Sequence, residues 1–105
     1  MEYLTNAFSL NMLNFEAGKV CVEVDPITPA EVPKSAASYL SHPDTARLVS
    51  SILGRECPEN RQDIRLSQGD ILFVAQYPGP RLLPGATTLP EGAKLEFLRV
   101  KIIPV

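Results

Sequence analysis

The apolar run Ile-Leu-Phe-Val-Ala at residues 71–75 most narrows the folds open to this chain, because it presents apolar side chains in both directions. A strand that is apolar on both faces is typical of the interior of a sheet covered on two sides. We therefore expect residues 71–77 to form a central strand in a layered α/β fold. The chain has 105 residues, the size of one domain, and we assign residues 1–105 to a single domain.

Alternating or apolar segments predict the remaining strands. They lie at residues 3–8, 18–24, 64–66 and 95–103. In the second of these, Val20, Val22 and Val24 share one face, and Asp25-Pro26 is expected to end the strand. Residues 9–14 carry polar side chains at close spacing, which favours a turn or one helical turn, and residues 68–70 predict a second turn.

Two segments carry signals for the start of a helix. Thr28 precedes a proline and lies three residues before Glu31, which predicts a helix that reaches residue 39 or 40, bent or delayed by Pro33. A second helix is expected to begin within residues 41–44 and to end at Gly54. The sum is a mixed sheet of about five strands with two or three helices.

Charge and cysteine content exclude several classes of partner. Ten Lys and Arg against twelve Asp and Glu give a net charge of −2, so no general attraction to DNA is expected. Cys21 and Cys57 are spaced as neither a metal-ligand pair nor a disulfide framework, and Cys21 lies in an apolar run typical of a buried thiol. With one histidine in the chain, we expect no metal site.

Targeting signals are also lacking in the sequence. The first ten residues show no basic region followed by an apolar stretch, as a secretion signal would. No uninterrupted apolar run approaches the roughly 20 residues that a membrane-spanning helix requires. We therefore expect a soluble cytoplasmic protein without a membrane partner.

His42 is the single histidine of the chain, and histidine is the residue type that ordinarily gains or loses its proton near neutral pH. It stands at a predicted helix start, where free backbone amides attract anions. One interpretation is a helix-capping or surface histidine. The other is a general acid that cleaves a phosphodiester.

Polar residues elsewhere are candidates for ligand contacts. Asn6, Ser9, Asn11 and Asn14 gather near the end of the first strand, although turn chemistry alone explains such residues in many proteins. Arginines 61 and 81 lie in polar loops near strand ends, a common place for binding residues. Residues 78–92 form a long Pro/Gly-rich loop of a length more often functional than not.

Four ordered blocks resemble the ring nucleases that act as anti-CRISPR proteins against type III systems, a family of small viral and prokaryotic proteins. The blocks are Asn6-Ala7-Phe8-Ser9-Leu10-Asn11-Met12-Leu13, Ser41-His42-Pro43-Asp44-Thr45-Ala46, Asn60-Arg61 with Leu66 and Gly69-Asp70, and a closing part containing Gln76, Arg81 and Phe97-Leu98-Arg99-Val100-Lys101-Ile102. The resemblance spans nearly the whole chain.

The resemblance implies a homodimer that binds cyclic tetra-adenylate and cuts it, without metal or cofactor, into linear di-adenylates. It implies His42 as the general acid. It also implies substrate contacts from a set of polar residues: Asn6, Ser9, Asn11, Arg61, Gln76, Arg81 and Glu91. Two alternatives stay open from the sequence, a domain that sequesters the cyclic nucleotide uncut and a protein-interaction domain that uses Leu82, Leu83 and Leu89 of the long loop.

Overall fold

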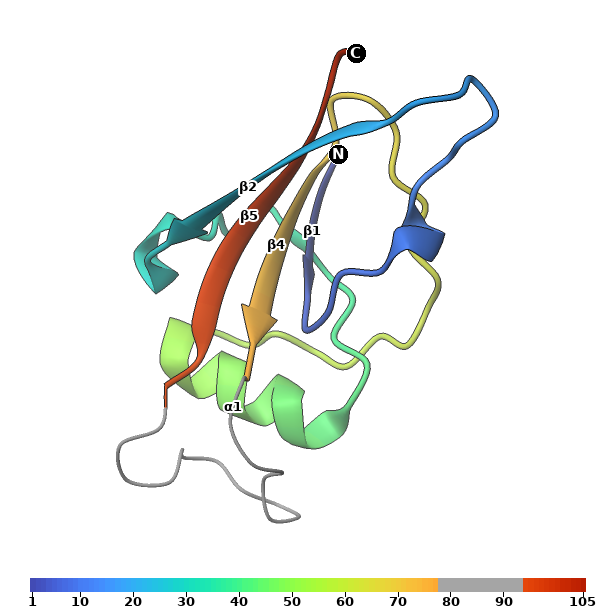
Figure 1. The fold of residues 1–105 in the computed structure, drawn as a ribbon. Coiled ribbons are helices and arrows are strands. Elements are labelled where there is room, and N and C mark those ends of the chain that lie inside the picture. Colours follow the sequence, from blue (N-terminus) through green and yellow to red (C-terminus); the bar gives the residue numbers. More distant parts are fainter. Residues whose placement is uncertain (78–93) are drawn as a thin grey trace.

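The computed structural model describes residues 1–77 and 94–105 and contains one five-stranded sheet (Figure 1). Its strands are β1 (Glu2–Thr5), β2 (Cys21–Ile27), β3 (Ala37–Ser38), β4 (Ile71–Gln76) and β5 (Glu96–Ile103). They lie in the order β2-β5-β4-β1-β3. β1 is parallel to both β3 and β4, whereas β5 is antiparallel to β2 and β4. The predicted mixed sheet is therefore confirmed.

β4 occupies the middle of the sheet, as the apolar run predicted. Its residues 72–75 are all buried, and successive side chains point to opposite faces. Phe73 and Ala75 join one apolar core, and Leu72 and Val74 join the other. A strand with this pattern requires cover on both sides, which accounts for the two cores.

The two faces are covered by different kinds of structure. The helix α1 (Pro43–Leu53) packs through Ala46 and Val49 onto the face that carries Phe73. In Figure 1 this helix crosses the lower ends of β4 and β5. The opposite face is covered by irregular segments, which bury Leu13 and Leu66 against it.

The helix predicted from Thr28 to residue 39 or 40 is wrong. The predicted capping box forms, and the Thr28 amide donates to Glu31 Oε2 at 2.8 Å, but only the 3-10 turn η2 (Pro29–Glu31) follows. Pro33 has no amide to donate to a continuing helix. The chain then enters β3, where pairing with β1 satisfies the backbone instead. The described residues thus contain one α-helix and two 3-10 turns, the other being η1 (Leu10–Met12).

Three predicted strand boundaries also need correction. β1 ends at Thr5, not at residue 8, and 64–66 contributes only an isolated bridge between Leu66 and Leu13. β2 begins at Cys21, not at residue 18, and continues through Asp25-Pro26 to Ile27. An edge strand has a neighbour on one side only, so a proline there need not remove a hydrogen bond of the sheet. The predicted strand at 95–103, helix end at Gly54 and turn at 68–70 are confirmed.

Both cysteines carry free thiols. Cys57 is buried in the helix-covered core, whereas Cys21 is only half-buried, so the expectation of a buried Cys21 is wrong in degree. Cys21 lies on the edge strand β2, which has one neighbouring strand to cover it. Among residues 1–77 and 94–105, no helix is long and apolar enough to cross a membrane. The predicted loop at 78–92 lies outside the described residues.

Gly54 ends α1 in the left-handed conformation, with φ of 69°. A Cβ built there would meet nothing within 4 Å, so an alanine would cost only backbone conformational energy. We expect Gly54→Ala to lower the free energy of unfolding by about 1 kcal/mol. Gly54→Asn is the matched control and should lose less, because asparagine tolerates this conformation better. Urea unfolding of the three proteins measures both values, and equal stability of the alanine variant would contradict the prediction.

Candidate functional site

The carboxyl ends of β1 and β4 define one edge of the sheet where polar residues meet. The two strands are parallel neighbours, with Thr5 opposite Val74. Asn6 follows β1 directly, and Gln76 is the last residue of β4. Parallel register therefore brings these two predicted site residues to the same edge.

Residues 39–42 continue this edge beyond β1. The Tyr39 amide donates to the Leu4 carbonyl at 2.7 Å, and the Thr5 hydroxyl donates to the Tyr39 carbonyl at 3.3 Å. Leu40, which is fully buried, then fixes the segment in the core. These contacts lead the chain to His42 beside the end of β1.

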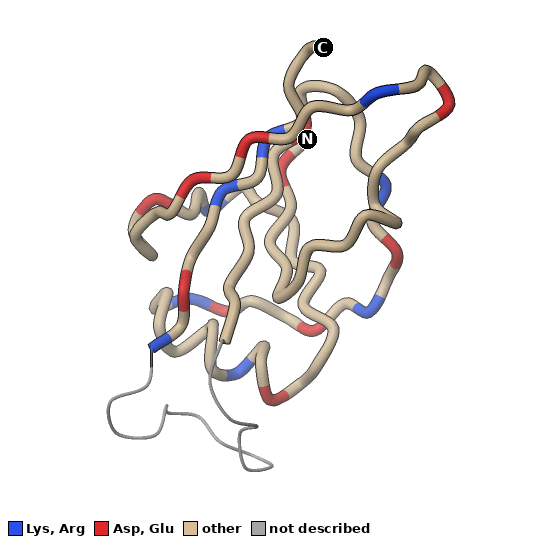
Figure 2. Tube along the Cα trace, viewed as in Figure 1, with Lys and Arg blue, Asp and Glu red and all other residues tan. Residues whose placement is uncertain are grey.

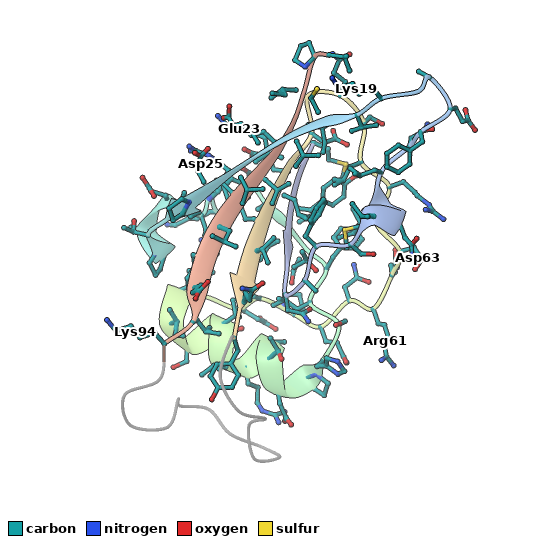
Figure 3. The ribbon with its side chains drawn as sticks, viewed as in Figure 1. Lys19, Glu23, Asp25, Arg61, Asp63 and Lys94 are labelled. Atoms are coloured by element: carbon teal, nitrogen blue, oxygen red, sulfur yellow. The ribbon has the colours of Figure 1, made fainter. Side chains whose placement is uncertain are left out.

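The residues just before Arg61 are paired with the segment that carries His42. The Asn60 amide donates to the Leu40 carbonyl at 2.8 Å, and Leu40 forms a parallel bridge with Glu59. The segment that carries Arg61 therefore lies next to the segment that carries His42. Figure 3 shows Arg61 extending outward on the side of the molecule where the N-terminal end of α1 lies.

His42 is the N-cap residue of α1, with extended backbone angles of φ −133° and ψ 139°. Its carbonyl accepts the first helical hydrogen bond from the Ala46 amide at 2.9 Å. Within the part of the chain that the structure describes, its imidazole makes no capping hydrogen bond, and the residue is exposed. The interpretation of His42 as a helix-capping, surface residue is therefore confirmed, although the imidazole itself makes no capping bond.

Ser9 and Asn11 belong to the turn η1, which follows β1 along the chain. The Ser9 hydroxyl accepts a hydrogen bond from the Asn11 amide at 3.2 Å, so turn chemistry explains Ser9 at least in part. Both residues line a surface hollow of 390 Å³ together with residues 62–65. Arg65, which also lines the hollow, donates to the Asn11 carbonyl. The hollow adjoins Arg61 along the chain.

Two polar groups of this region were not predicted. The side-chain amide of Gln76 donates to Glu96 Oε2 at 3.4 Å, which places a carboxylate at the edge. Ser41 donates both its amide and its hydroxyl to Asn6 Oδ1, each at 3.0 Å. Neither contact has a sequence signal, because each joins residues 20 or more positions apart. Arg81 and Glu91, which the resemblance places at the site, lie outside the described residues.

Charges near the edge are mixed. Acidic and basic side chains alternate along segment 59–65, and Figure 2 shows this alternation on the right side of the view. In the first turn of α1, Asp44 forms an ion pair with Arg47. An anionic ligand would therefore be held by individual arginines and not by a uniformly positive surface. The described residues contain no group of three or more His, Cys, Asp or Glu side chains that could hold a metal ion.

A pKa shift is found on β1, at Tyr3. Burial raises the pKa of Tyr3, and the negative charge of Asp70 and the neighbouring Tyr39 raise it further. The Tyr3 and Tyr39 rings pack edge to face with centroids 5.2 Å apart. Tyr3 stands near the amino end of β1, so this shift reflects the packing of that strand.

The fold and the edge define a small α/β protein whose polar groups gather where two parallel strands end, beside the start of one helix. The family model of STIV B116-like proteins matches residues 2–97, so the chain belongs to the STIV B116-like family. B116 of Sulfolobus turreted icosahedral virus has a similar structure, with a TM-score of 0.71 and 23% sequence identity. The similarity covers 94% of this chain and 97% of that one, and it establishes a shared fold. No curated protein sequence matches the chain.

Proposed function

We propose that this protein is a metal-independent ring nuclease that cleaves cyclic tetra-adenylate and so switches off type III CRISPR second-messenger signalling. The observation that carries the proposal is the exposed His42, which follows Ser41 at the edge of the sheet that also holds Asn6 and Gln76, with the segment of Arg61 next to its own segment. The resemblance of the blocks around these residues to known ring nucleases supplies the substrate class. Membership of a family named after a viral protein agrees with an anti-CRISPR role.

The proposed reaction requires the protein to position the ring, to bind its phosphate charges and to protonate the leaving oxygen. A ribose 2′-hydroxyl gives its proton to water and its oxygen attacks the adjacent phosphorus in line; the bond from phosphorus to the 5′-oxygen breaks, and a 2′,3′-cyclic phosphate remains. His42, as imidazolium, gives its proton to the leaving 5′-oxygen. Arg61 would hold phosphate oxygens with its planar guanidinium, and Ser9, Asn11 and Gln76 would bind riboses or bases. Arg81 and Glu91 would complete the site.

A homodimer suits the symmetry of this substrate. A ring of four identical nucleotides contains a two-fold axis, and two copies of one chain related by such an axis treat its halves alike. Each His42 would then serve one of two opposite phosphodiester bonds. Two cuts at opposite bonds yield two linear di-adenylates with 2′,3′-cyclic phosphate ends.

Incubation of the purified protein with cyclic tetra-adenylate in excess chelator tests the proposal directly. We expect liquid chromatography with mass detection to show di-adenylates with a cyclic phosphate, formed at the same rate with and without chelator. A collapse of the rate in chelator would reveal a metal-dependent enzyme. An intact ring would overturn the proposed activity, and a binding titration would then separate a sequestering protein from a protein-interaction domain.

A further inference from the structure

The side-chain oxygen of Asn6 already accepts hydrogen bonds from within the protein. This half-buried residue accepts two hydrogen bonds at Oδ1, one from the Ser41 amide and one from the Ser41 hydroxyl, both at 3.0 Å. The bonds span 35 positions in the sequence and connect the end of β1 to the residue immediately before His42. An oxygen that accepts two donors in this way is not free to serve as the main contact for a ligand.

The backbone of His42 is consequently held from both sides. Upstream, Ser41 is attached to Asn6, and downstream the His42 carbonyl accepts from the Ala46 amide of α1. The imidazole itself is exposed and takes no part in capping among the described residues. Its direction therefore depends on the backbone that carries it, and that backbone is set by these two attachments.

We infer that Asn6 and Ser41 are a positioning pair for His42, and that Asn6 acts on the reaction through this histidine. The inference rests on the proposed function for the reaction itself, but the pair is a structural feature that can be measured separately. Small displacements of an acid from the leaving oxygen slow proton transfer, because the donor must lie within hydrogen-bond reach. Loss of the pair should thus lower kcat while leaving ligand affinity almost unchanged.

Three variants test the inference, namely Asn6→Ala, Ser41→Ala and the double variant. Ser38→Ala is the matched control, because the Ser38 hydroxyl also donates one hydrogen bond, at 2.6 Å to the Pro58 carbonyl, but leaves the Asn6 contact intact. We expect Asn6→Ala to lower kcat about 3- to 10-fold, the scale of neutral hydrogen bonds, with an unchanged dissociation constant for the cyclic nucleotide. Ser41→Ala should lower kcat less, because the hydrogen bond from the backbone amide of residue 41 to Asn6 Oδ1 persists. The double variant should resemble Asn6→Ala, since the two residues act as one unit.

Two further measurements test the inference without measuring cleavage. Amide hydrogen exchange at Ser41 should become about 3- to 10-fold faster in Asn6→Ala, and the single imidazole resonance of this chain should shift in that variant but not in Ser38→Ala. Unchanged exchange at Ser41 would overturn the inference even if cleavage slowed. A weaker affinity with unchanged kcat would also overturn it, because Asn6 would then be a ligand contact. If the unmodified protein cleaved nothing, the proposed function would fall, and exchange at Ser41 would still decide whether Asn6 holds the turn.

Discussion

Replacement of His42 by alanine is expected to lower kcat for cleavage of cyclic tetra-adenylate by about 10²- to 10⁴-fold, the usual contribution of a general acid. The affinity for the intact ring should change little, because phosphate contacts come from arginines and base contacts from amides. The imidazole is exposed and makes no capping bond within the described residues, so its loss should not disturb α1. Single-turnover cleavage and a binding titration measure the two effects separately.

His42→Gln is the matched variant for this experiment. Glutamine keeps a polar side chain and a hydrogen-bond donor at the helix start, but its amide is too weak an acid to transfer a proton to a leaving alkoxide. We expect it to be as slow as His42→Ala, with both variants unfolding at the temperature of the unmodified protein. Cleavage at the full rate in either variant would remove His42 from the mechanism. An equal loss of binding and cleavage would assign the residue to ligand recognition instead.

The parts of the fold that the sequence predicted are those set by local pattern. Residues 71–75 are apolar in both directions, and only the centre of a covered sheet accommodates such a strand. The helix that ends at Gly54 likewise follows from local chemistry, because glycine reaches the left-handed region without a steric penalty. In both cases the residues that decide the structure are close in sequence.

The predictions that were wrong involve competition with distant partners. Thr28 and Glu31 form their capping box as expected, yet Pro33 and the pairing of β3 with β1 convert the following residues into extended chain. Similarly, β2 continues past Pro26 because it lies at the edge of the sheet, a position that no local pattern reveals.

The candidate site shows the same division. Residue type and position singled out His42 and Arg61, but nothing in their spacing shows that the segments carrying them are neighbours. The structure pairs these segments through the hydrogen bond from Asn60 to Leu40, two residues 20 positions apart. The link between Asn6 and Ser41 is equally nonlocal, and it is the observation from which we infer that Asn6 supports the histidine.

Arg61→Ala is expected to weaken binding of cyclic tetra-adenylate by about 10- to 100-fold, because hydrogen bonds to charged groups contribute about 1.5–3 kcal/mol. Arg61→Lys should recover part of this loss, since lysine keeps the charge but not the planar fork that matches phosphate oxygens. Lys19→Ala is the matched control, as it removes the same charge from the opposite end of the sheet (Figure 3). A fluorescence or calorimetric titration with the His42→Ala background avoids cleavage during the measurement.

The comparison of Arg61 with Lys19 separates local recognition from general charge. If both alanine variants lost affinity equally, the cyclic nucleotide would respond to net charge, and the edge formed by Asn6, His42, Arg61 and Gln76 would not be its binding site. If neither lost affinity, the phosphates would be held elsewhere in the chain. We expect a loss confined to Arg61→Ala and partly restored by Arg61→Lys. This result would follow if Arg61 binds a phosphate of the ring at this edge, because the planar guanidinium then matches two phosphate oxygens.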